Sequence, residues 1–167
     1  KNILREEIKI KSVPYSSMLD GNVGYIRLTG FTENAGGEVK DALTALQAKG
    51  KLTGVILDLR GNPGGLLNEA VNIVNIFVNK GVEVVSTKGK VKGWDKEYHA
   101  LNNPVDTEIP VAVLVNSGSA SASEIVSGSI QDLDRGIVIG QRTFGKGLVQ
   151  TTRPLSYNAQ LKVTTAK

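Results

Sequence analysis

Two short apolar runs place the strongest constraint on the fold of this chain. Residues 55–59 read Val-Ile-Leu-Asp-Leu, and residues 110–115 read Pro-Val-Ala-Val-Leu-Val. Runs of this length and composition are typical of buried strands. Each is followed by a turn of small residues and then by a segment with helical periodicity. Strands that alternate with helices in this way predict an α/β domain with a mainly parallel central sheet flanked by helices.

The other segments extend the same alternation. Apolar residues recur at helical spacing in three segments, residues 37–49, 67–78 and 121–133. Further strands are expected at residues 23–28, 82–85, 136–140, 148–151 and 161–164. Residues 3–13 alternate charged with apolar side chains, which predicts a half-exposed strand that Pro14 ends.

A polar segment at residues 88–101 interrupts the pattern. It contains Trp94 and Tyr98, which either form an exposed aromatic patch or pack in the core or in a hairpin. Its lysines are separated by Gly, Val and Trp. This spacing, with a net charge of only +4, favours a solvated basic hairpin over a surface for nucleic acid.

Composition excludes several classes of protein. A chain of 167 residues with 40% apolar and 22% charged residues is typical of one globular domain. The absence of cysteine excludes disulfides and thiolate metal sites. No stretch approaches the roughly 20 apolar residues of a membrane-spanning helix, and no signal peptide opens the chain. Because no group of His, Asp and Glu shows metal-ligand spacing, we expect no metal.

The residue types that are missing also restrict the possible chemistry. Without cysteine, a Cys–His nucleophile is excluded. The single histidine, His99, lies in the polar segment, where a solvent-facing loop position is expected. A Ser-His-Asp triad would have to use that imidazole. Lysine is the remaining candidate for a strong base.

Ser121 lies in a favourable setting for a nucleophile. Residues 116–124 form a run of small residues between a predicted strand and a predicted helix. The start of a helix presents free backbone N–H groups, which can stabilise developing negative charge. Helix capping is the alternative interpretation, because all four serines of this run are good caps.

Lys146 lies between two glycines and before a predicted strand. A free lysine has a pKa near 10.4, so it must be buried among apolar groups to act as a neutral base. Phe144, Leu148 and Val149 are apolar neighbours in sequence. Gln150 can orient the amine if residues 146–150 are extended, because strand side chains repeat every two residues. An ordinary surface lysine in a glycine turn is the alternative.

The glycine-rich turn at residues 60–65 follows a buried strand and precedes a helix. It lacks the GxxxxGK[ST] and GxGxxG patterns, so it is a weak candidate for a nucleotide loop. Gly64 or Gly65 can equally offer a backbone N–H to an acyl oxyanion. The structural alternative is a tight strand-to-helix turn, and such a turn is compatible with the oxyanion role.

Three of these segments together resemble a known family, the carboxyl-terminal processing proteases, also called tail-specific proteases. The matching segments are residues 55–66, 115–125 and 140–150. They occur in the order and with the spacing of the family, and the similarity extends from about residue 24 to the end. Three linked motifs are far more specific than any one of them.

The resemblance implies a serine endopeptidase that cleaves protein substrates near their C-terminus with a Ser–Lys dyad. By position in the motifs, Ser121 matches the nucleophile, Lys146 the general base and Gln150 the residue that orients the lysine. The backbone N–H groups of Gly65 and Ala122 match the donors of the oxyanion hole. The implied fold is the α/β core of crotonase-like and Clp-type proteases, without cofactor or metal.

The resemblance also implies features of the wider protein. Family members act on proteins and peptides with free C-terminal tails, many of them through a PDZ module. No such module is recognisable here, and the family core usually continues beyond residue 167. We therefore expect residues 1–167 to be a fragment that holds most of the catalytic core. Bacterial members usually work outside the cytoplasm, so a periplasmic or cell-envelope location is expected.

Other functions stay open at this point. A partial core can be a catalytically silent binding or scaffold domain on the same fold. A crotonase-like acyl-CoA enzyme would bind coenzyme A, and retinoid-binding relatives use the fold to hold a ligand. The pairing of Ser121 with Lys146 favours the protease over these alternatives.

Overall fold

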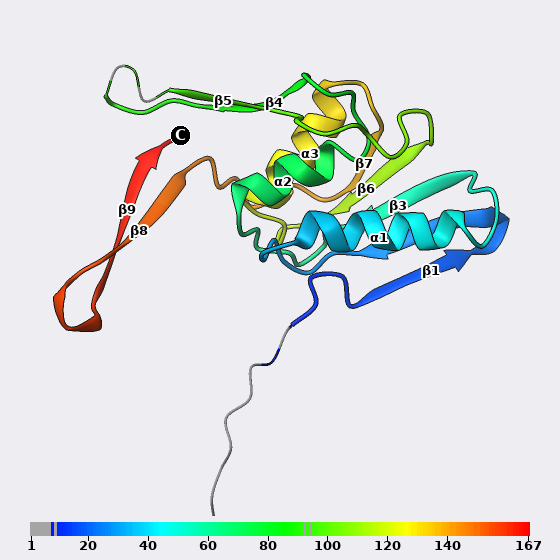
Figure 1. Cartoon of the computed structure of the whole chain (residues 1–167), viewed down its shortest axis with the longest axis horizontal. Helices are drawn as coiled ribbons and strands as arrows, with labels where there is room; N and C mark the ends of the chain where they lie inside the picture. Colours follow the sequence, from blue (N-terminus) through cyan, green and yellow to red (C-terminus); the bar gives the residue numbers. More distant parts are fainter. Residues whose placement is uncertain (1–7, 9, 92, 94) are drawn as a thin grey trace, which may run out of the picture.

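The computed structural model describes residues 8, 10–91, 93 and 95–167 and has a five-stranded sheet at its centre (Figure 1). Its strands, in spatial order, are β1 Tyr15–Leu19, β2 Val23–Arg27, β3 Gly54–Asp58, β6 Val111–Val115 and β7 Ile137–Gly140. The last four run parallel, and β1 is antiparallel to β2. The predicted α/β domain with a mainly parallel sheet is confirmed.

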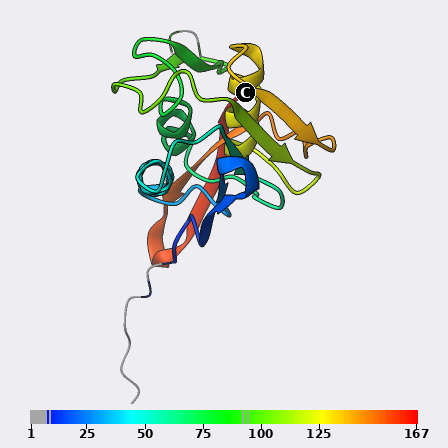
Figure 2. The same cartoon turned by 90° about the vertical axis from the view of Figure 1, so that its right-hand side faces the viewer.

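Three helices pack against this sheet. They are α1 Ala35–Gln47, α2 Leu67–Val74 and α3 Ala122–Asp132. Successive parallel strands are added in one direction across the sheet, so right-handed connections place the helices on one face (Figure 2). On that face Leu57 and Val113 are fully buried, whereas Ile56 on the other face is only half-buried. None of the described helices is long and apolar enough to cross a membrane.

Two antiparallel hairpins extend from this core. The first pairs β4 Glu83–Thr87 with β5 Lys96–His99, and the second pairs β8 Val149–Pro154 with β9 Gln160–Ala166. Short 3-10 turns occur at Asp20–Asn22 and Ser156–Asn158. The backbones of Lys88 and Lys167 exchange hydrogen bonds of 2.8 and 3.0 Å. The end of the second hairpin therefore pairs with the chain that leaves β4.

The predicted strand at residues 3–13 is wrong wherever the structure describes it. Ile8 and Ile10 are 84% and 80% exposed and lie outside any strand. The strand is β1 instead, which begins directly after Pro14. The tight turn at Asp20–Asn22, in which Gly21 has a φ of +75°, pairs β1 with β2 as a hairpin. The position of β1 is therefore set by its pairing with β2 across this turn. The alternation of charged and apolar residues over residues 3–13 did not predict it.

Two further boundaries differ from the sequence-based prediction. The helix expected over residues 67–78 ends at Val74. The Asn75 side chain exchanges hydrogen bonds of 2.8 and 2.7 Å with the backbone of Asn102, which redirects the chain. The polar segment at residues 88–101 includes β5, so Tyr98 lies in a hairpin strand, while Trp94 lies outside the described residues.

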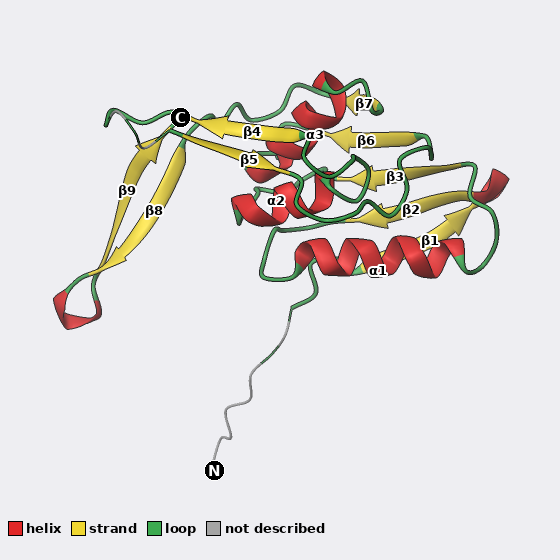
Figure 3. Cartoon of the chain, turned by 45° about the horizontal axis from the view of Figure 1, so that its top comes forward, coloured by secondary structure: helices red, strands yellow, loops and turns green. Residues whose placement is uncertain are grey.

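The parallel strands end at one edge of the sheet, and this edge is where open α/β sheets bind ligands. The arrowheads of β2, β3 and β6 point to the side of the molecule from which the β8–β9 hairpin extends (Figure 3). At the end of β3, the buried side chain of Asp58 pairs with Arg60 at 2.7 Å and accepts a hydrogen bond from the Tyr25 hydroxyl. This network holds the first turn of the loop after β3.

The Asp58 network makes a prediction about stability. Burial raises the pKa of Asp58, but the hydrogen bonds from Arg60 and Tyr25 outweigh it and lower the pKa from 3.8 to about 2. A lowered folded-state pKa gives stability that is present above the unfolded pKa and is lost as pH falls from about 4 towards 2. Asp58→Asn should therefore lower the free energy of unfolding at pH 7 by about 2 kcal/mol.

Urea unfolding at pH 7 and at pH 3 measures this effect. The difference between wild type and Asp58→Asn should shrink at the lower pH. Asp41→Asn, at an exposed position on α1, is the matched control and should leave both values unchanged. An equal loss of stability at both pH values would contradict the proposed role of the Asp58 charge.

Candidate active site

A cleft of about 550 Å³ lies at the carboxyl edge of the sheet. It is bounded by the loop after β3, the start of α3, strand β4, the loop before β8 and the second hairpin. All five site residues predicted from the sequence line it, namely Gly65, Ser121, Ala122, Lys146 and Gln150. The structure thus brings together residues from three separate segments of the chain.

Buried polar side chains join the two loops that form the floor of this cleft. Asn62 is fully buried, and its amide donates to the Leu28 carbonyl at 2.9 Å. The Asn62 carbonyl accepts hydrogen bonds from the Ser123 hydroxyl at 2.9 Å and from the Ala120 N–H at 3.1 Å. The Asn116 side chain accepts from the Gly61 N–H at 2.8 Å. These contacts fix the loop after β3 against the loop after β6.

The same contacts distinguish Ser121 from the other serines of its run. Ser119 and Ser123 are fully buried, and their hydroxyls donate to the carbonyls of Leu59 and Asn62. Ser117 is exposed and does not line the cleft. Ser121 alone of the four is half-buried and faces the cleft. Buried hydrogen bonds therefore hold the hydroxyls of Ser119 and Ser123, whereas Ser121 lies at the cleft.

Ser121 has an unusual backbone conformation. It is the N-cap of α3, so the capping interpretation is correct for its position, and its φ and ψ are +55° and −114°. Positive φ is rare for a residue with a side chain, and this ψ lies outside the ordinary left-handed region. Such strained residues cluster at active sites, and a sharp strand-to-helix turn exposes a nucleophile in many hydrolases.

Two backbone N–H groups beside Ser121 are available to a ligand. Within the described part of the chain, neither the Gly65 N–H nor the Ala122 N–H has a backbone or side-chain acceptor. Gly64 allows the loops to approach this closely, because a Cβ there would lie 2.6 Å from the Ala120 carbonyl oxygen. Gly64 also has a φ of +96°, which favours glycine. The loop after β3 thus holds a free donor next to the first turn of α3.

The Glu124 carboxylate connects the serine turn to the lysine loop. Its Oε2 accepts hydrogen bonds from the backbone N–H groups of Ser121 at 2.7 Å and Lys146 at 2.8 Å. Its Oε1 accepts from the Gly145 N–H at 2.7 Å and the Thr143 hydroxyl at 2.8 Å. One carboxylate oxygen therefore holds the main chains of both Ser121 and Lys146.

The environment of Glu124 favours its ionised form. Burial raises its pKa, but the hydrogen bonds from Thr143, Ser121, Gly145 and Lys146 lower it below the ordinary value. Its negative charge also lies in the first turn of α3, where the helix dipole stabilises an anion. Glu124 is not among the site residues predicted from the sequence. The spacing Ser121-x-x-Glu124 before an apolar segment is a capping-box signal and could have identified it.

Lys146 and Gln150 reach the cleft differently from the prediction. Residues 142–148 have no regular structure and β8 begins at Val149, so the expected alternation along an extended strand does not place these two side chains. Lys146 is half-buried, while Phe144 and Leu148 are 69% and 49% exposed. These two apolar side chains therefore do not form the enclosure that the sequence indicated around the amine.

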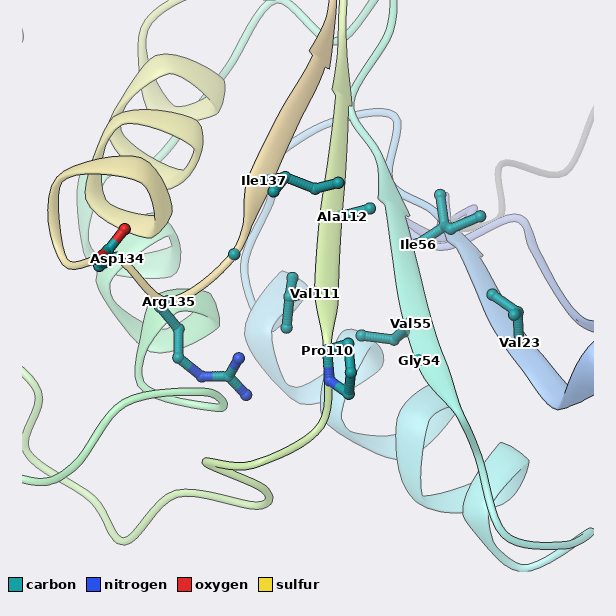
Figure 4. A pocket seen from close by; sticks show the side chains of 11 residues that line it. Val23, Gly54, Val55, Ile56, Pro110, Val111, Ala112, Asp134, Arg135 and Ile137 are labelled. Atoms are coloured by element: carbon teal, nitrogen blue, oxygen red, sulfur yellow. The ribbon is translucent and has the colours of Figure 1, made fainter.

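His99 lies outside this cleft, as expected for a residue without a catalytic role. It is on β5 in the first hairpin, however, and not in a loop. A second hollow lies at the opposite, amino ends of β3, β6 and β7 (Figure 4). There the Arg135 guanidinium donates to the carbonyls of Phe77, Asp106 and Ile109. Its charged group is thus used in structural contacts, and the carboxyl-edge cleft is the better candidate site.

A model of peptidase family S41 matches residues 22–167. The chain belongs to this family. It is 46% identical over 167 residues to the carboxy-terminal-processing protease of Bartonella bacilliformis, covering 98% of this chain and 38% of that protein. It is 44% identical over 168 residues to a probable CtpA-like serine protease of Staphylococcus epidermidis, covering 99% of this chain and 33% of that protein. This S41 chain therefore spans about a third of the length of these relatives.

Solved structures support the same assignment. The photosystem II D1 C-terminal processing protease superposes with a TM-score of 0.77 at 37% identity, covering 94% of this S41 chain and 41% of that one. A putative S41 protease from Bacteroides fragilis superposes with a TM-score of 0.80 at 17% identity, covering 96% of this chain and 47% of that one. The second match concerns the fold alone. The predicted family and fold class are confirmed.

The position of Glu124 predicts the effect of removing its charge. Glu124→Gln should lower the free energy of unfolding by about 1–3 kcal/mol, because an amide cannot accept all four hydrogen bonds. It should also speed amide exchange at Gly145 and Lys146, which hydrogen–deuterium exchange measures. Since the folded-state pKa of Glu124 is lowered, its contribution is complete at neutral pH and is lost as pH falls through that pKa.

Glu33→Gln provides the control for this prediction. Glu33 is exposed before α1 and should tolerate the change. Unchanged exchange at Gly145 and Lys146 in Glu124→Gln would show that the lysine loop is held by other contacts.

Proposed function

We propose that the protein containing this chain is a serine endopeptidase in which Ser121 and Lys146 form the catalytic dyad. The observation that best supports this proposal is the shared Glu124 carboxylate oxygen, which accepts from the backbones of both residues at one cleft. Family membership and the printed function of the relatives point to the same chemistry.

The reaction follows from these positions. The Lys146 amine, in its neutral form, accepts the proton of the Ser121 hydroxyl as Oγ attacks the carbonyl carbon of a peptide bond. The tetrahedral intermediate then collapses, the C–N bond breaks, and the leaving amine takes the proton from Lys146. Water attacks the resulting acyl-enzyme ester by the same route and releases the new C-terminus. Gln150, on the wall of the cleft, is proposed to orient the amine.

The oxyanion of the intermediate is proposed to accept hydrogen bonds from the Gly65 and Ala122 N–H groups. Both groups lie at the cleft and lack internal acceptors in the described structure, so they can bind the oxyanion without prior rearrangement. Loss of one such donor typically costs ~10²–10³ in rate. The first turn of α3 adds the favourable field of its helix dipole.

The substrates are proposed to be proteins and peptides cleaved near a free C-terminus. The cleft wall has apolar side chains, among them Leu66, Val85 and Ile125, that can receive apolar residues of an extended peptide. The relatives are longer than this chain, and tail selection by a separate module such as a PDZ domain fits that difference. The compared relatives are bacterial, and a periplasmic or cell-envelope location is proposed for a bacterial parent because bacterial members of the resembled family usually work outside the cytoplasm.

Single substitutions in the whole protein test the dyad. Ser121→Ala and Lys146→Ala should each lower kcat/KM by ~10³-fold or more while the unfolding transition stays intact. Ser117→Ala and Lys49→Ala, at exposed positions outside the cleft, are the matched controls and should keep full activity. The substrate is an unstructured peptide with a free apolar C-terminus, compared with its amidated form. Full turnover in either dyad variant would refute the assignment.

Two alternatives give different outcomes in the same experiments. A catalytically silent binding domain would bind the peptide without hydrolysis in the wild-type protein. An acyl-CoA enzyme would bind coenzyme A, for which a calorimetric titration suffices. Neither alternative explains why two serines are buried in structural contacts while Ser121 faces the cleft in a strained conformation.

A further inference from the structure

The first hairpin contains a group of possible metal ligands apart from the cleft. Glu83, Glu97 and His99 each offer one ligand atom, and these atoms all lie within 4.8 Å of one another. None of the three residues lines the cleft that holds Ser121. The sequence did not reveal this group, because Glu83 meets Glu97 and His99 only across the hairpin.

Strand pairing explains why the three side chains share a face. Glu83 on β4 is paired directly with His99 on β5. Glu97 lies two residues before His99 on the same strand, so both side chains point to the same side. Directly opposed residues of antiparallel strands have their Cβ atoms about 4.5–5.5 Å apart. The group is therefore set by backbone pairing and not by flexible loops.

The base of this hairpin is held firmly beside the group. Backbone hydrogen bonds join Gly81 to Ala100 at 2.7 Å and Ala100 to Val82 at 2.9 Å. The Ser129 hydroxyl of α3 donates to the Val84 carbonyl at 2.9 Å. Figure 1 shows the hairpin next to α2 and α3. Only side-chain rotations are then needed to bring the ligand atoms together.

The three side chains have no competing partners among the described residues. The one ion pair within 4 Å there is that of Arg60 with Asp58, so neither glutamate pairs with His99 or with a lysine. Two carboxylates so close together repel each other, and a bound cation would remove that repulsion. A zinc ion with ligands at 2.0–2.2 Å needs ligand atoms about 3.3–3.5 Å apart, which is a small closure from the observed spacing.

We propose that Glu83, Glu97 and His99 bind a zinc ion. One imidazole nitrogen and two carboxylate oxygens suit zinc, whereas calcium and magnesium prefer oxygen ligands alone. Water completes the coordination. The ion ties β4 to β5, and β4 contributes Val85, Ser86 and Thr87 to the cleft wall. Zinc thus stiffens one wall of the cleft without taking part in the reaction there.

Zinc titration of the metal-free, untagged whole protein by calorimetry tests the proposal. We expect one zinc per chain with a micromolar Kd, and binding at least about tenfold weaker in His99→Ala, Glu83→Gln and Glu97→Gln. Glu33→Gln, an exposed glutamate outside the group, should bind zinc as the wild type does. The glutamine variants keep the size of the side chain, so weaker binding there is not a folding defect.

The imidazole nitrogen resonances of His99, assigned by their loss in His99→Ala, give a second readout. Zinc should shift one imidazole nitrogen resonance of His99 in the wild-type protein. Three outcomes would overturn the proposal: no binding up to about 1 mM zinc, equal binding in all ligand variants, or displacement of zinc by an equal concentration of calcium.

Discussion

The Glu124 carboxylate is the interaction on which the geometry of the site depends. The segment that contains Lys146 has no helix or strand to position it, so its backbone groups need partners elsewhere. Glu124 supplies them from the first turn of α3, and the same oxygen that accepts from Lys146 also accepts from Ser121. The charge is favoured there by four donors and by the helix dipole. A single half-buried carboxylate thereby sets the distance between the main chains of Ser121 and Lys146.

The floor of the cleft forms because adjacent parallel strands end at the same edge of the sheet. β3 and β6 are adjacent and end at the same edge of the sheet, so the loops that follow them meet. Asn62, Ser119 and Ser123 satisfy the buried backbone groups of these loops. The Gly65 and Ala122 N–H groups are left without acceptors at the cleft. These structural hydrogen bonds thus leave two backbone N–H donors and the Ser121 hydroxyl available at the cleft.

The two hairpins form walls of the cleft, and they differ in how they contact the rest of the structure. The first packs against α2 and α3 and holds the proposed zinc ligands. The second extends away from the sheet, with large exposed apolar side chains such as Leu155 and Tyr157, and meets the first through the pairing of Lys88 with Lys167. The relatives to which this S41 chain was compared are about three times as long as it is.

The sequence by itself determined the alternation of strands and helices, because apolar periodicity and glycine-rich turns depend on near neighbours in the chain. Its three linked motifs also pointed, by resemblance, to the family and to five candidate site residues, although the local pattern around Ser121 left four serines open. Tertiary structure decided which of four serines faces the cleft, placed β1 after Pro14, and gave Glu124 its partners. It also brought Glu83 to Glu97 and His99 across a hairpin. Except for β1, which pairs with β2 across a short turn, and the capping contact of Glu124 with Ser121, these features depend on contacts between residues far apart in the sequence, and no local pattern specifies those contacts.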